Sequence, residues 1–221
     1  MALRSLKLPV ICGLAAIFLA ACSSSDDLDL TTSWLGPLHN YERVGAGTSG
    51  GIFILKDVKP AAADRILMAP AEITVSVESD LNSISPRAYE RIRRLFADAL
   101  ARELSKQPNN TSDNADTYIV RIALTNLTAK RIGKEISATA LSDLKFSFGT
   151  AAIEAELRHQ LTNSRDAVIL MPAPGPETTI SGLPGLFASF AEKISARVSQ
   201  ARTELSKRSR APVVPKPAAK Q

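Results

Sequence analysis

The sequence predicts an α+β fold, in which a mostly antiparallel sheet of about four to five strands carries two main helices on one face. Three observations support it: segments in which polar and apolar residues alternate, two longer segments with helical spacing, and the order β-α-β-β-β-α. Because each alternating strand has one apolar side, both helices can bury their apolar stripes on that side. The other sheet face is polar enough to meet water or a partner.

The first regular strand is expected over residues 66–77. Pro70 cannot donate a ladder hydrogen bond, so the strand lies at an edge or is interrupted there. Residues 34–62 mix aromatic and apolar residues with loop-formers, which favours irregular packing with one short strand near residues 52–55. From Glu72 onward the alternation is clear, and one face carries Ile73, Val75 and Val77.

A helix follows, with Ser85 and Pro86 as its N-cap and first residue, and it ends before Pro108. Its apolar residues recur at helical spacing. The second predicted helix opens at residues 182–185. The apolar stripe of the first helix comprises Ala88, Tyr89, Ile92, Leu95, Phe96, Ala99, Leu100 and Leu104, and that of the second comprises Phe187, Phe190, Ile194, Val198, Ala201 and Leu205.

Three strands are predicted between the helices, over residues 117–128, 151–161 and 167–171, with a turn at 163–166 joining the last two. On the first of them Tyr118, Val120, Ile122 and Leu124 face one way. On the second, Ile153, Ala155, Leu157 and Leu161 are expected to face inward, and Glu154, Glu156, Arg158 and Gln160 outward.

The N-terminal residues 1–21 have the layout of a secretory leader. Arg4 and Lys7 precede an apolar run too short to span a bilayer, and Leu19-Ala-Ala-Cys22 resembles the lipobox of bacterial lipoproteins. That resemblance implies cleavage before Cys22, lipidation of Cys22, and anchoring to a membrane. The alternatives are an ordinary secretory signal that ends near a cysteine, or a cytoplasmic protein with a buried N-terminal helix.

Composition limits the chemistry of the mature chain. Cys12 leaves with the leader and Cys22 is lipidated, so no thiol remains for catalysis, metal binding or a disulfide. The net charge of +5 arises from the ends of the chain, and residues 22–206 carry 20 basic and 22 acidic residues. Without a basic, aromatic-bearing face, nucleic acid is not an expected partner.

The expected organisation is a leader (1–21), a lipidated flexible tether (22–33), one α/β periplasmic domain (34–206) and a disordered basic tail rich in Pro and Ala (207–221). In enterobacterial lipoproteins Asp after the cysteine favours inner-membrane retention, so Ser23 favours the outer membrane. The tail carries five basic residues and no acid, which suits anionic partners such as peptidoglycan.

Several segments resemble the DUF3313 family of bacterial lipoproteins, which has no assigned biochemical function. They are Gly36-Pro-Leu-His-Asn-Tyr41, Lys59-Pro60, Ser85-Pro86 and the small-residue strand Gly149–Leu157. The resemblance covers roughly residues 34–205 and departs at Arg165-Asp166, near which the family usually has Gly. It implies the compartment and the fold, and supplies no catalytic residue.

Known catalytic motifs are weak. Gly45–Gly50 has dinucleotide-loop spacing without the required strand and helix, and Gly51 stands where a phosphate loop needs Lys. His159 is expected to be hydrogen-bonded and half-buried, and with the distant His39 it makes no zinc site. Spacing alone leaves a Ser-His-Asp triad open. The Ser142–Lys145 match to Ser-x-x-Lys lies in a loop rather than at a helix start.

Glu154 and Glu156 lie two residues apart on one strand, about 7 Å apart, a spacing that a hydrolase pair can use. With Arg158 beside them, a solvated sheet surface is the preferred interpretation. We therefore expect no catalytic residue, cofactor or metal. The favoured role is a non-enzymatic adaptor or accessory subunit of an envelope assembly, with a small-molecule or lipid carrier as the alternative and an enzyme third. A carrier needs an apolar pocket, such as one between the sheet and residues 34–62.

Overall fold

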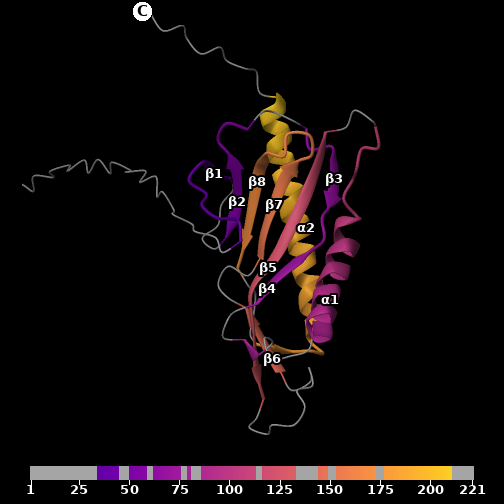
Figure 1. Ribbon diagram of the computed structural model, residues 1–221. Helices are drawn as coiled ribbons and strands as arrows, with labels where there is room; N and C mark the ends of the chain where they lie inside the picture. The colour runs from indigo at the N-terminus through magenta and orange to yellow at the C-terminus, as the bar shows by residue number, and fades with distance from the viewer. Residues whose placement is uncertain are drawn as a thin grey trace, which may run out of the picture.

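A computed structural model of the protein describes residues 34–44, 50–58, 62–75, 79–80, 86–112, 116–132, 144–148, 153–172 and 177–210. Both helices lie on one side of a single sheet (Figure 1). The mixed fold of two helices and a largely antiparallel sheet is confirmed, but the sheet has nine strands, more than the four to five predicted. The elements are β1 (Tyr41–Val44), β2 (Gly51–Leu55), β3 (Arg65–Met68), β4 (Glu72–Val75), α1 (Pro86–Leu104), β5 (Thr117–Arg131), β6 (Leu144–Phe148), β7 (Ile153–His159), β8 (Arg165–Met171), β9 (Thr178–Thr179) and α2 (Leu183–Arg210).

The long strand β5 organises the sheet. Its residue Tyr118 pairs with β3 and β7 at once, and Leu127 pairs with β4 and β6 at once. Parallel strands β3 and β4 therefore share one edge of β5, and antiparallel strands β7 and β6 share the other. Beyond β7 follow β8, β2 and β1, while β9 pairs with β6.

The additional strands have simple physical origins. Pro70 interrupts the predicted strand 66–77 and divides it into β3 and β4, although the amide of Ala69 still donates to the carbonyl of Val120 at 2.9 Å. Strands β1, β6 and β9 are five residues long or shorter. Segments of that length contain too few residues to show a period of two, so their pairing is decided by tertiary contacts.

The main hydrophobic core lies between the helices and the sheet. Phe96 of α1 packs against Phe187 of α2 with ring centroids 5.3 Å apart, and Phe190 meets Phe148 of β6 edge to face at 5.5 Å. The apolar stripe of α2 is confirmed as buried, and so is that of α1, except that Tyr89 and Leu95 are half-buried. The core residues contributed by α1 are Ala88, Ile92, Phe96, Ala99, Leu100 and Leu104.

The C-terminal part of α2 fastens two neighbouring segments to the core. Arg202 donates hydrogen bonds to the carbonyl oxygens of Ala63, Asp64 and Pro108, at 2.7–3.0 Å. Burial lowers the pKa of this guanidinium. The helix continues to Arg210, so the predicted boundary of the domain at residue 206 falls inside α2 rather than at its end.

Every core residue that the structure describes lies between Leu35 and Leu205. Among the described residues no helix has the length and apolarity needed to cross a bilayer. The predicted leader, Cys22 and residues 211–221 lie outside the described residues.

Candidate functional site

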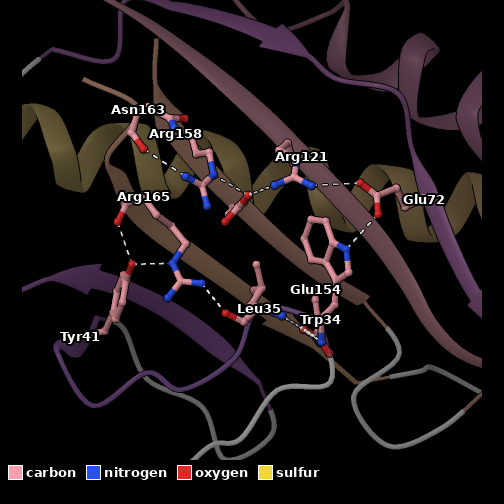
Figure 2. Close-up of polar contacts among 10 residues, drawn as sticks. Trp34, Leu35, Tyr41, Glu72, Arg121, Glu154, Arg158, Asn163 and Arg165 are labelled. Atoms are coloured by element: carbon pink, nitrogen blue, oxygen red, sulfur yellow. Dashed lines mark hydrogen bonds and ion pairs between the residues drawn. The ribbon is translucent and has the colours of Figure 1, made fainter. Parts of the chain in front are cut away.

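A cluster of charged residues covers the sheet face that points away from the helices. The N-terminal residues 34–41, here named the N-terminal strap, lie across this face (Figure 2). Side chains from β4, β5, β7 and β8 meet the strap there. The cluster combines three acidic and three basic residues, so its formal charges balance; they are Glu72, Glu154 and Glu156 with Arg121, Arg158 and Arg165.

Glu156 is the centre of this cluster. Its carboxylate accepts hydrogen bonds from Arg121 of β5 at 2.8 Å and from Arg158 of β7 at 2.7 Å. The register places Arg121 directly opposite Glu156, so the contact follows from the strand pairing. Only 1% of Glu156 is exposed, so the expected solvated surface is wrong at this position. Its charge is matched by two guanidinium groups, as burial of a carboxylate requires.

Glu154 holds the strap to the sheet. Its Oε2 accepts the backbone N–H groups of Trp34 and Leu35, both at 3.0 Å, and the residue is fully buried. A carboxylate that accepts two backbone amides is a strong local anchor. The prediction that Glu154 faces solvent is therefore wrong as well.

Five further contacts fix the strap along its length. The indole Nε1 of Trp34 donates to Glu72 at 2.9 Å, and Arg121 lies over the same ring at 5.0 Å from its centroid. Arg165 donates to the carbonyl of Leu35 and to the hydroxyl of Tyr41, which in turn donates to the Arg165 carbonyl at 2.7 Å. Burial raises the pKa of Tyr41, so its hydroxyl stays protonated and remains a donor.

Apolar contacts fill the rest of the space beneath the strap. Val168 and Leu170 of β8 point to this side, whereas Ala167, Ile169 and Met171 join the main core. Residues 167–171 are thus an unbroken apolar run because both faces of the strand are covered, and the run Ile52–Leu55 of β2 gives the same sequence signal for a cover over this face. The second cluster comprises Leu35, Leu38, Phe53, Val168 and Leu170, with Trp34 and Tyr41 packed on it.

The end of the predicted strand 151–161 also differs from expectation. Strand β7 ends at His159, and Leu161 lies in the following turn with 88% of its surface exposed, so its predicted inward orientation is wrong. The turn between β7 and β8 lies at residues 160–164 rather than at the predicted 163–166, because Arg165 and Asp166 already belong to β8, and Asn163 adopts a positive φ of 54° within it. That conformation suits Asn at a tight turn.

His159 is hydrogen-bonded near the end of β7 as expected, but it is buried rather than half-buried. Its Nδ1 lies 3.1 Å from the hydroxyl of Thr162 and accepts the Thr162 amide, while Nε2 lies 3.7 Å from Asp116. These three residues resemble a hydroxyl–imidazole–carboxylate set. Thr162 is exposed at the tip of the hairpin, however, where water would screen any developing charge. The contacts are those of a hydrogen-bonded turn.

A buried pair lies beside His159. The Tyr118 hydroxyl donates to the Asp166 carboxylate at 2.8 Å, and the Tyr118 ring meets the imidazole edge to face. A register shift in the β7–β8 ladder leaves Asp166 as the extra residue. Burial, helped by Asp166, raises the pKa of Tyr118 strongly, so Tyr118 acts as a donor and not as a base.

The other candidate residues are dispersed. His39 is exposed on the strap, about 120 residues from His159 in sequence. Cys22, residues 45–49, 59–60, Ser85, residues 142–143 and 149–152 lie outside the described residues. Within the described ranges no group of three or more His, Cys, Asp or Glu residues is arranged to hold a metal ion.

Comparison with known proteins gives no family match: no family model and no curated protein matches this chain. The resemblance to DUF3313 therefore stays a prediction. Among solved structures the chain is similar to the PelC dodecamer from Paraburkholderia phytofirmans, at 15% identity and a TM-score of 0.31, covering 67% of this chain and 98% of that chain.

Two other solved structures are similar to the chain. One is described as a neuraminyllactose-binding hemagglutinin homologue from Helicobacter pylori, at 9% identity and a TM-score of 0.37, covering 68% of this chain and 91% of that chain. The other is the DUF330 protein XCC0632 from Xanthomonas campestris, at 11% identity and a TM-score of 0.30, covering 68% and 91% respectively.

Proposed function

We propose that this protein is a periplasmic lipoprotein of the DUF3313 type, held in the outer membrane through Cys22. In this proposal it is a non-catalytic adaptor or accessory subunit of an envelope assembly. One observation supports the role most directly: Glu154 ties the first described residues of the chain to the middle of the sheet. A tether that ends at Trp34 would thus be joined to a firmly held segment rather than to a loose end.

The burial and hydrogen bonding of the acidic residues in the charged cluster also support a non-catalytic role. Glu154 and Glu156 are buried and accept hydrogen bonds from the strap amides and from two guanidinium groups. A general acid or a nucleophile has to reach its substrate. These two carboxylates lie beneath the strap, where their lone pairs stabilise the fold.

A small-molecule or lipid carrier is the alternative function. The space considered for its pocket, between the sheet and the N-terminal segment, is occupied by side chains that include Leu35, Leu38 and Phe53. A carrier would have to lift the strap, breaking the two hydrogen bonds to Glu154 and the contacts of Arg165. The adaptor role needs no such opening.

The first experiment tests the anchor. We expect the Cys22→Ala variant to incorporate no labelled palmitate and to lose its resistance to carbonate extraction from membranes. The matched control is Cys12→Ala, which changes the other cysteine, expected within the cleaved leader, and should be labelled like the wild type. Continued labelling of Cys22→Ala would refute the lipoprotein assignment.

The second experiment separates the adaptor from the carrier. A photo-crosslinking residue is placed in intact cells at exposed positions on opposite sides of the domain, such as Leu67 of β3 and Lys193 of α2. An adaptor should give one adduct of defined mass, from one side of the domain only. Adducts of lipid mass, enriched when the strap is loosened by Glu154→Ala, would favour the carrier.

A further inference from the structure

The solvent side of α1 carries an unusual set of basic residues. The helix contains five arginines and no lysine. Arg87, Arg91 and Arg94 are exposed and line one side of an open groove of about 530 Å³, whose lining also includes Pro86, Leu95 and Asp98. This set of Arg87, Arg91 and Arg94 is here named the arginine groove.

The three arginines lie on one helix face. At 1.5 Å per residue, Arg87 and Arg91 are separated by about 6 Å along the axis, and Arg91 and Arg94 by about 4.5 Å. Like charges at this spacing repel one another and weaken an isolated helix. An anionic surface placed on this helix face would offset the repulsion.

The acidic residues near the arginine groove do not neutralise its positive charge. Glu90 also lines the groove, but it forms a two-point ion pair with Arg93, at 2.9 and 3.1 Å. The hydrogen bonds from Arg93 lower the pKa of Glu90, and its charge is matched by that partner. Among the described residues, no hydrogen bond or ion pair is formed by the guanidinium groups of Arg87, Arg91 and Arg94. Asp98 is the remaining acid in the groove lining.

We propose that the arginine groove docks the domain onto anionic phospholipid headgroups. Guanidinium groups bind phosphate oxygens through two parallel hydrogen bonds, which lysine cannot do. The groove is open and shallow and holds three cations in a row, which fits a charged surface better than a single enclosed ligand.

The choice of a membrane as the occupant rests on the envelope location proposed above. The strap that follows the tether lies on one side of the sheet and α1 lies on the other (Figure 1). Eleven residues separate Cys22 from Trp34, and the twelve extended Cα–Cα steps between them span about 40 Å. A layer of sheet plus a layer of helices is about 20 Å thick, so the tether is long enough for α1 to reach the bilayer that holds the anchor.

Vesicle binding tests the proposal independently of lipidation. The protein is produced from residue 23 to 210, which keeps the whole described domain and removes the leader, Cys22 and part of the basic tail. It is sedimented with vesicles of phosphatidylethanolamine and phosphatidylglycerol, or of phosphatidylcholine alone. We expect binding to the anionic vesicles only, and weaker binding in high salt.

The decisive variant is Arg87→Gln/Arg91→Gln/Arg94→Gln. Each positive charge near the membrane surface is expected to raise the affinity about fivefold. Removing three charges should therefore lower the partitioning onto vesicles about 100-fold. The matched control removes three exposed lysines elsewhere, in Lys56→Gln/Lys106→Gln/Lys193→Gln, and should lose less than about fivefold. Equal losses in the two triple variants, or wild-type binding by the arginine variant, would overturn the proposal.

Two measurements keep the outcome interpretable. Thermal melts should show a midpoint for the arginine variant no lower than that of the wild type, because all three side chains are exposed and their mutual repulsion is removed. If the glutamine variant fails to fold, Arg87→Lys/Arg91→Lys/Arg94→Lys keeps the charge and should retain salt-sensitive binding that is weaker than wild type. If the protein fails to bind vesicles but Cys22 is labelled with palmitate, docking through the arginine groove is refuted and the anchor stands. If the protein binds vesicles but is not labelled, the anchor is refuted and docking through the groove stands.

Discussion

Replacing Glu156 by alanine should destabilise the domain by about 2–3 kcal/mol. The change removes two charge-assisted hydrogen bonds, of 2.8 Å to Arg121 and 2.7 Å to Arg158. Losing one member of a fully buried ion pair costs about 3–5 kcal/mol. The side chains of Arg121 and Arg158 are 37% and 28% exposed, so water recovers part of that cost. Each arginine also keeps a second partner, Glu72 or the Asn163 carbonyl.

Urea unfolding measures this effect with two signals. Trp34 is the only tryptophan in the chain, so its fluorescence reports the strap, while circular dichroism reports the helices and the sheet. A loss of 2–3 kcal/mol corresponds to a melting temperature about 5–10 °C lower for a domain of this size. The control Glu177→Ala removes an exposed acid 3.8 Å from Lys145 and should change stability by less than about 0.5 kcal/mol. An unfolding midpoint for Glu156→Ala equal to that of the control would refute our account of the charged cluster.

Three other predictions follow from particular contacts. Leu157→Asp should abolish cooperative unfolding because it buries an unpaired charge, whereas Leu161→Asp at the exposed turn should melt like the wild type; equal melts would contradict our assignment of the strand faces. Arg202→Ala should cost about 2 kcal/mol and speed hydrogen exchange around residues 62–66, and unchanged exchange there would argue against its anchoring role. The pKa of Tyr118 is raised in the folded state, so its stabilising effect is complete below about pH 10. Above that pH the free energy of unfolding should fall by about 1.4 kcal/mol per pH unit. If tyrosinate absorbance shows that all tyrosines of the folded protein titrate near pH 10, this prediction is contradicted.

Long periodic segments made most of the fold predictable. The stripes of α1 and α2 and the inward faces of β5 and β7 follow from spacing alone, because burial of one face dictates the pattern. Position 70 was also informative, since proline forces the break that separates β3 from β4. The short strands β1, β6 and β9 were not predictable, because their pairing is decided by tertiary contacts.

The burial of the charged cluster could not be predicted from the alternation of polar and apolar residues. Alternation placed Glu154, Glu156 and Arg158 correctly on one face, but the solvent exposure of that face depends on what covers it. The cover is a strap about 120 residues away in sequence, fixed by Trp34 and Leu35. The matched carboxylates and guanidinium groups make burial tolerable, so a polar strand face alone does not predict exposure.

The topology of β2 bears on how the chain reaches its native state. Among the described strands, β2 pairs with β1 and with β8, and the register joins Phe53 to Val168, more than 110 residues later. Loop-closure entropy makes such non-local pairing slow, in the range of milliseconds to seconds for sheet-rich domains. During synthesis the N-terminal end of the chain emerges first. The apolar segment Ile52–Leu55 therefore stays without its β8 partner until β8 has been synthesised. During that interval the segment exposes apolar surface and an unpaired strand edge, which favours aggregation.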